Sequence, residues 1–252
     1  MKKWKQPLLV LAVLVGALLV GAVVVGILNA TVANGALTFG WTDFRYDEEG
    51  YTVGEGSVYA KKITGIAVNW LDGSVEIVPC RDTYVSVTER SASTLPESAK
   101  LRWKVDENGL LTVKSRKSGW VFTTANHKKD LILRVPEQML ASIGTLSVSA
   151  ADADVRVNDI PISTVAISCK KGNVEWRAAA APDTLAISLS HGDVKLCLPQ
   201  DASFRLEWPT KHGKLTCGFE VTREGDVYTA GEGKAKISVS NKTGNLLIDL
   251  YQ

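Results

Sequence analysis

The sequence has few cysteines and few histidines for its length. Its 252 residues include four cysteines and three histidines. There is no C-x-x-C pair and no histidine at zinc-finger spacing, so the sequence predicts neither a disulfide framework nor a structural metal site. We expect free thiols at all four cysteine positions. These are Cys80, Cys169, Cys197 and Cys217.

An excess of one charge is also missing. The chain has 29 Lys and Arg against 27 Asp and Glu, a formal net charge of +2. Without a basic stripe, nucleic acid is not expected as a partner. The sequence also has no nucleophile elbow, P-loop, dinucleotide fingerprint or H-E-x-x-H pair. These absences predict a non-catalytic protein that needs no cofactor.

What the sequence does contain is one spacing of residues used six times. Three apolar residues alternate with others, a glycine follows three positions later, and two more apolar residues alternate after it. Each copy therefore predicts two short, half-buried strands joined by a turn. The copies are Ile66–Ile77, Leu146–Val157, Val165–Trp176, Leu185–Leu196, Leu206–Cys217 and Ile237–Ile248.

The glycine of this frame is its structural marker. Glycine suits a turn that needs positive φ or a close approach of two backbones. One copy has Ala153 where glycine is expected. The predicted turn glycines are Gly73, Gly172, Gly192, Gly213 and Gly244.

A unit of about 20 residues cannot bury its apolar side alone, whereas stacked copies share one core. We therefore predict an all-β fold, a single-stranded parallel β-solenoid resembling a β-helix. The alternative is an antiparallel β-sandwich. Parallel stacking would bring Arg156, Glu175 and Lys195 into one outward column of alternating charge, about 4.8 Å apart. The same frame points Cys169 inward and Cys197 outward.

The N-terminus carries the second strong signal. Three lysines, Lys2, Lys3 and Lys5, precede an uncharged run from Leu8 to Leu28. A run of this length suffices for one transmembrane helix, and the lysines place the N-terminus in the cytoplasm. The rival interpretation is a signal peptide cleaved after Ala30 or Ala33.

These signals predict a single-pass protein of the cell membrane with an extracytoplasmic C-terminal domain. Its parts are a cytoplasmic N-terminus (1–7), a transmembrane helix (8–28), a connector (29–62) and a β-strand-repeat domain (63–252). The connector has four interleaved aromatic residues, which either rest at the membrane interface or cap the first coil. They are Phe39, Trp41, Phe44 and Tyr46.

Two weaker patterns involve residues capable of chemistry. His191 and His212 each precede a turn glycine, and stacked coils would bring the imidazoles close enough to bind a transition metal or to sense acid pH. The run containing Asp152, Asp154 and Arg156 contains the residue types of a β-helical polysaccharide lyase. In both cases ordinary solvent-facing residues explain the pattern better. His127 has no visible partner.

The Asn69–Ile77 and Val85–Glu89 segments, together with several later ones, resemble the bacterial putative-adhesin family of unknown function. The resemblance begins with the Asn69–Ile77 and Val85–Glu89 strands, and it includes the Leu-Pro-x-Asp-Ala element at 198–202. It closes with the glycine frame at 237–246 and covers nearly all of residues 63–250. The resemblance implies an envelope protein built on β-strand repeats, and it supplies no catalytic residue.

Three functions remain open at this stage. The first is an adhesin-like scaffold whose outward faces bind cell-wall polymer. The second is an accessory of envelope-stress signalling that binds a membrane protein. The third is a carbohydrate-active enzyme, for which activity would depend on Asp154.

Overall fold

Short strands account for nearly all regular structure in the computed structural model, which describes residues 41–59, 63–122, 128–210 and 212–251. Two 3-10 helices interrupt them, η2 (Glu97–Ala99) and η4 (Glu137–Ser142). The prediction of an all-β chain is confirmed. The strands are β1 (Trp41–Phe44), β2 (Thr52–Val53), β3 (Gly56–Tyr59), β4 (Gly65–Cys80), β5 (Tyr84–Ser91), β6 (Arg102–Val105), β7 (Leu110–Lys114), β8 (Gly119–Phe122), β9 (Lys129–Pro136), β10 (Thr145–Asn158), β11 (Thr164–Lys171), β12 (Val174–Arg177), β13 (Thr184–His191), β14 (Val194–Leu198), β15 (Phe204–Glu207), β16 (Leu215–Cys217), β17 (Thr222–Glu224), β18 (Val227–Ala230), β19 (Ala235–Thr243) and β20 (Leu246–Leu250).

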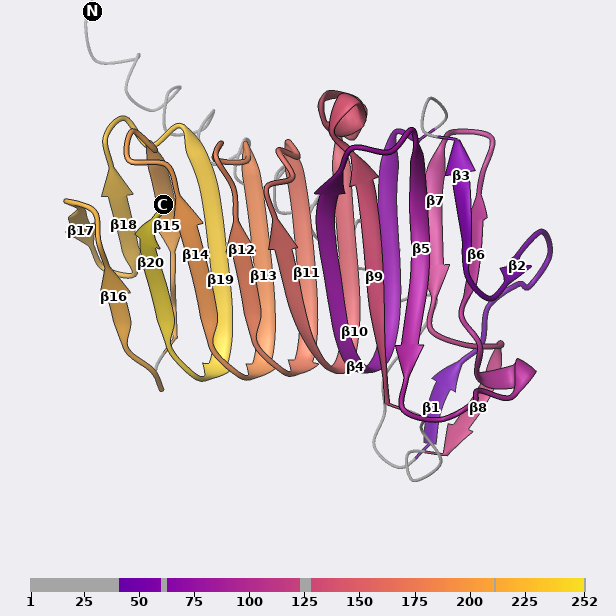
Figure 1. Ribbon diagram of the computed structural model, residues 1–252. Helices are drawn as coiled ribbons and strands as arrows, with labels where there is room; N and C mark the ends of the chain where they lie inside the picture. The colour runs from indigo at the N-terminus through magenta and orange to yellow at the C-terminus, as the bar shows by residue number, and fades with distance from the viewer. Residues whose placement is uncertain (1–40, 60–62, 123–127, 211, 252) are drawn as a thin grey trace, which may run out of the picture.

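Most strands stack in parallel and form two long faces of a solenoid-like body (Figure 1). The first face has the order β7, β4, β10, β11, β13, β19, β15. The second face has the order β9, β4, β10, β12, β14, β20, β16. The long strands β4 and β10 pass through both faces.

The alternation read from the sequence explains this stacking. Along β13, the side chains of Leu185, Ile187 and Leu189 are buried, whereas the side chains between them are partly exposed. Equivalent positions in the other layers join them in one continuous hydrophobic cluster that runs the length of the body. Full burial of each such side chain contributes about 1.5–3 kcal/mol, so neighbouring layers stabilise one another.

The layers do not follow the order of the chain. The copy that begins at Ile237 lies between the copies that begin at Leu185 and Leu206. The copy that begins at Ile66 lies directly against the copy that begins at Leu146, with about 80 residues between them in sequence. The layers are therefore not stacked in chain order at either end. At the N-terminal end the chain passes through β5 and β6 before β7 and β9 form the outermost layer. At the other end it turns through the β17–β18 hairpin and returns as β19, between β13 and β15.

Antiparallel strands close most of the open edges. At the N-terminal end, β5 pairs with β9 and β3, while β6 pairs with β7 and β2. At the other end, β18 pairs with β15 and β17. Unpaired strand edges favour association with other chains, and the caps oppose it at β7, β9 and β15. Among the described strands, β16 pairs only with β20, so its outer edge has no such cap.

The segment expected as a connector contributes β1, β2 and β3 to this structure. Phe44 is buried and packs with Leu71 in a small separate cluster, and the Tyr46 ring lies edge-on to Phe44 at a centroid distance of 5.7 Å. Phe44 and Tyr46 thus pack against the body, beside Leu71 of β4 and Ala151 of β10. Phe39 lies outside the described residues, as does the run from Leu8 to Leu28. No helix in the described part of the chain is long and apolar enough to span a membrane.

All four cysteines are free thiols. Cys169 points inward as predicted, and its burial raises the pKa of the thiol to about 11. Cys197 occupies an outward position in the frame but is only 6% exposed. An outward position on the second face is therefore not always an exposed one.

Candidate functional site

Charged side chains on the second face form the predicted column. Arg156, Glu175 and Lys195 occupy equivalent positions in consecutive layers. The carboxylate of Glu175 lies 3.9 Å from Arg156 Nε and 3.5 Å from Lys195 Nζ. All three side chains are at least a third exposed, so each ion pair contributes at most about 1 kcal/mol. The column organises the surface more than it stabilises the fold.

Next to this column runs a ladder of side-chain hydrogen bonds that the sequence analysis missed. The backbone N–H groups of Asn173, Asp193 and Asn245 donate to the side-chain Oδ1 atoms of Asp154, Asn173 and Asp193, at 2.8, 2.9 and 2.7 Å. Lys214 N–H donates to Asn245 Oδ1 at 3.0 Å. Acid and amide alternate, so no two carboxylates are neighbours in the ladder. Its signal in the sequence was an Asp or Asn directly after three of the turn glycines.

The column and the ladder together line a shallow, charged hollow of about 200 Å³. Asp154 accepts the ladder hydrogen bond and Arg156 faces Glu175, so both are engaged in structural contacts. Asp152 lies in a different column, between Asp72 and Lys171. The three residues considered for a lyase site are therefore part of the stacking of the layers.

The two histidines are not neighbours. His191 pairs in register with Thr243 of β19. On the other side of that layer, Gly244 N–H donates to the carbonyl of His212. A whole layer separates the imidazoles, so the prediction of an adjacent pair is wrong. The reason is the insertion of β19 and β20 between the layers that carry them. Within the described residues, no group of three His, Cys, Asp or Glu side chains is arranged to hold a metal. His127 lies outside those residues.

The turn glycines form a column along one edge of the body. Gly73, Gly172, Gly192 and Gly244 have positive φ, whereas Gly213 does not. A Cβ at Gly192 would collide with the carbonyl oxygen of Gly172 in the next layer. The backbones therefore approach too closely for any side chain, and glycine permits the conformation as well.

Three polar side chains inside the body hydrogen-bond to this turn column. Trp70 Nε1–H donates to the Lys129 carbonyl at 2.9 Å, and Asn241 Nδ2–H donates to the Gly192 carbonyl at 2.7 Å. Cys169 Sγ–H donates to the Ala153 carbonyl at 3.2 Å. In each case the donor lies three residues before its own turn position and bonds to the turn residue of the adjacent layer. Asn241 was the visible signal, since it is a polar residue at an inward position.

The outward side of the first face is lined by small polar residues. In consecutive layers, Ser149, Ser168, Ser188 and Ser240 are in register. A parallel column of threonines begins the same strands of β10, β11 and β13. The spacing between strands places these hydroxyls about 4.8 Å apart along the body. The result is a regular array of hydroxyl groups, which ends at Asn69 of β4 in the serine column and at Lys236 of β19 in the threonine column.

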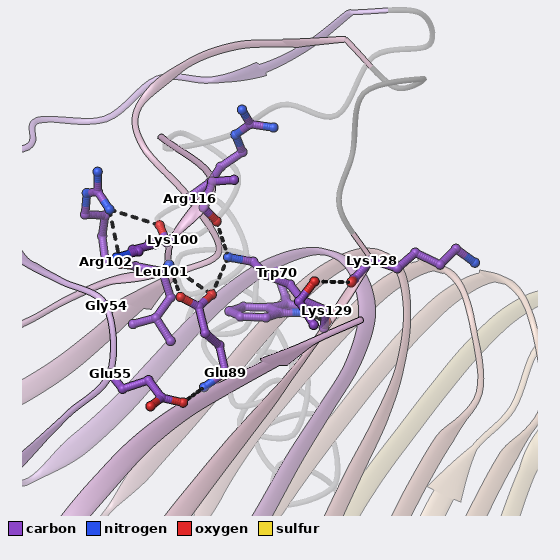
Figure 2. A network of polar contacts seen from close by, with 12 residues as sticks. Gly54, Glu55, Trp70, Glu89, Lys100, Leu101, Arg102, Arg116, Lys128 and Lys129 are labelled. Atoms are coloured by element: carbon purple, nitrogen blue, oxygen red, sulfur yellow. Dashed lines mark hydrogen bonds and ion pairs between the residues drawn. The ribbon is translucent and has the colours of Figure 1, made fainter. Parts of the chain in front are cut away.

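A buried polar network fills the N-terminal end (Figure 2). Lys129 Nζ lies 2.6 Å from Glu89 Oε2 and also donates to the carbonyl of Ala99, and it lies over the Trp70 ring at 5.1 Å. Leu101 N–H donates to both carboxylate oxygens of Glu89. Burial lowers the pKa of Lys129 to about 8, although the bond to Glu89 opposes the shift. These bonds join β5, β9 and the segment from Ala99 to Leu101, so the network holds the end cap together.

A second buried amine lies nearby. Lys114 is only 3% exposed, and its Nζ lies over the Tyr46 ring at 5.1 Å. Burial and, to a lesser extent, the charge of Lys104 lower the pKa of Lys114 to about 8. Tyr46 is held in place because its hydroxyl donates to the Arg116 carbonyl at 2.7 Å. The N-terminal cap therefore contains two desolvated amines.

The repeated frame and its solenoid-like stacking correspond to a known family. The family model for Toastrack DUF4097 matches residues 63–184 and, a second time, residues 143–249. The chain belongs to the Toastrack DUF4097 family. The two matches overlap across β10, β11 and β12, in the middle of the body, as expected for a fold in which one unit recurs.

One solved structure supports the fold of this Toastrack chain. A putative cell adhesion protein from Clostridium sporogenes is similar over 79% of this chain and 100% of that chain, with 12% identity and a TM-score of 0.58. A putative adhesin from Bacteroides fragilis matches over 78% of this chain and 97% of that chain, with 11% identity and a TM-score of 0.25, which is too low to bear on the fold. No curated protein matches the chain.

Proposed function

We propose that this protein is a non-catalytic, membrane-anchored scaffold of the cell envelope that binds wall glycan along its first face. The observation that carries the proposal is the register of Ser149, Ser168, Ser188 and Ser240 across four layers. A flat array of hydroxyls at a regular spacing can exchange hydrogen bonds with a polymer that lies along it. Ser240 is exposed, and Ser149, Ser168 and Ser188 are half-buried.

Two further points support this function. The ends of the body are capped by antiparallel strands, which leaves the lateral faces as the extended surfaces available for a partner. The family match and the adhesion-related description of the similar Clostridium protein agree with a surface role. In this proposal the run from Leu8 to Leu28 is the anchor and the body is extracytoplasmic.

The test is co-sedimentation of the full-length protein, in mild detergent, with purified cell-wall sacculi. Ser168→Arg places a long charged side chain in the middle of the array and should abolish binding. The matched control is Thr216→Arg, which makes a similar change at an exposed position of the second face. Equal binding by both variants would refute the assignment to the first face. Failure of the unmodified protein to bind would refute wall-glycan binding itself.

Membrane attachment has its own test. In fractionated cells the full-length protein should remain with the membrane after a high-salt wash, and protease added to intact, wall-stripped cells should degrade the C-terminal body. Release of the protein into the soluble fraction would contradict the anchor. Protection from the protease would contradict the extracytoplasmic location.

A further inference from the structure

A second surface feature lies at the C-terminal end of the body, away from the hydroxyl array. The β17–β18 hairpin folds against β15 at this end (Figure 1). A hollow of about 530 Å³ lies between this hairpin and the turn that follows Pro199. Small-molecule sites usually have volumes of about 300–1,000 Å³. The hollow therefore has room for a small ligand or for one or two units of a polymer.

The hollow combines an apolar wall with a polar rim. Phe219 and Val221 provide apolar surface, and Phe219 lies edge-to-face against the fully buried Phe204 with the ring centroids 5.3 Å apart. This contact fixes the Phe219 ring to the core. Thr222 and Thr229 add hydroxyl groups to the lining, and the Thr222 hydroxyl lies within hydrogen-bonding distance of the Thr229 carbonyl.

The charge of the hollow is negative. Asp201 and Glu220 both line it and both are exposed. Among the described residues of the lining there is no lysine, arginine or histidine to neutralise them.

Basic side chains from the surrounding strands have other contacts. Arg205 faces Glu207 at 3.9 Å, and Lys234 faces Glu232 at 3.0 Å. The guanidinium of Arg223 lies over the Tyr228 ring, and its Nε–H donates to the Gly225 carbonyl. The two carboxylates of the hollow are therefore left to act on a ligand.

We infer that this hollow binds a protonated amine carried on a hydroxylated chain, as in a glycan whose amino sugars are not acetylated. Carboxylates attract the ammonium group, and an aromatic ring adds a cation–π contact. The threonine hydroxyls suit the sugar's own hydroxyl groups. The inference rests on the proposed wall-glycan binding, since it adds a separate subsite, at the C-terminal end of the body, that selects amino sugars.

The experiment is a titration of the full-length protein, in mild detergent, with a tetrasaccharide of glucosamine at a pH where its amines are protonated. The N-acetylated tetrasaccharide is titrated in parallel. We expect the free-amine form to bind at least about tenfold more tightly. The double variant Asp201→Asn/Glu220→Gln should lose that preference, and Phe219→Leu should weaken binding while it preserves the apolar contact with the core.

The matched control is Asp226→Asn/Glu224→Gln, which removes two charges from the same hairpin at positions outside the lining. Equal loss in this control would overturn the inference, because it would show attraction by net charge alone. No preference for the free amine would overturn it as well. Sacculus binding measured on the same samples separates this failure from that of the proposed function. If the protein binds sacculi but does not prefer the free-amine tetrasaccharide over the N-acetylated one, only the subsite is refuted.

Discussion

Replacement of Lys114, one of the two buried lysines of the N-terminal cap, should change how the stability of the protein depends on pH. Lys114 is 3% exposed, and burial lowers the pKa of its amine from 10.5 to about 8. Between these two pH values the unfolded chain holds a proton that the folded chain has released. Unfolding then takes up a proton, so the free energy of unfolding rises as the pH rises.

The size of the effect follows from the same pKa. A fall from 10.5 to about 8 corresponds to about 3 kcal/mol between neutral pH and a pH above the unfolded value. Lys114→Met removes this contribution. The free energy of unfolding of the Met variant, minus that of the unmodified protein, should therefore fall by about 3 kcal/mol from about pH 7 to about pH 11.

The comparison between variant and unmodified protein is needed because other groups titrate in the opposite direction. Burial raises the pKa of Cys169 to about 11 and that of Tyr51 to about 12, so their contribution to stability is lost as the pH rises through this range. These contributions are common to both proteins and cancel in the difference. The assay is urea unfolding followed by tryptophan fluorescence, with Lys236→Met at an exposed site as the control. A difference that stays constant with pH would show that the amine of Lys114 is hydrated in the folded protein.

Three further substitutions test the interior by the same urea assay. Asn241→Leu should lower the free energy of unfolding by about 1–3 kcal/mol, because the Gly192 carbonyl loses its donor; an unchanged value would mean that water replaces the amide. Gly192→Ala should cost more than about 2 kcal/mol, and more than Gly225→Ala, where φ is also positive but the space is open; equal losses would exclude the backbone clash. Glu89→Ala should cost about 3–5 kcal/mol, and adding Lys129→Met should recover much of it; no recovery would contradict a penalty from an unpaired buried amine.

The stacking was predictable because the same frame recurs in the sequence. Apolar alternation and a turn glycine identify which residues share a column, and the column of Arg156, Glu175 and Lys195 is in register as expected. The order of the layers was not predictable in this way. Every copy presents the same inward pattern, so nothing in a single copy identifies its neighbour. The β17–β18 hairpin sends the chain back between two layers, and no pattern within a single copy indicates this.

The polar contacts of the candidate sites depend on that order. Glu89 and Lys129 are 40 residues apart and meet only because β5 pairs antiparallel with β9. The two histidines are separated by a layer that the sequence places after both of them. Asn241 was visible as a polar residue at an inward position, but its acceptor, the Gly192 carbonyl, follows only from the layer contact. The pattern within one copy predicts which of its residues point inward or outward. It does not predict these contacts, because they form between different copies.

The two ends of the body are built by the same device, and this bears on function. At each end the outermost layer is paired with antiparallel strands (Figure 1). At one end β5 pairs with β9 and β6 pairs with β7. At the other end β18 pairs with β15. A simple solenoid would end in parallel strands with free edges, and such edges would let chains stack end to end. Here the paired edges oppose a polymer made by end-to-end stacking, while the lateral faces keep their regular spacing. A protein that blocks growth along its axis but keeps its sides open is suited to bind an extended partner alongside, and the hydroxyl array on the first face is the surface where we expect that partner.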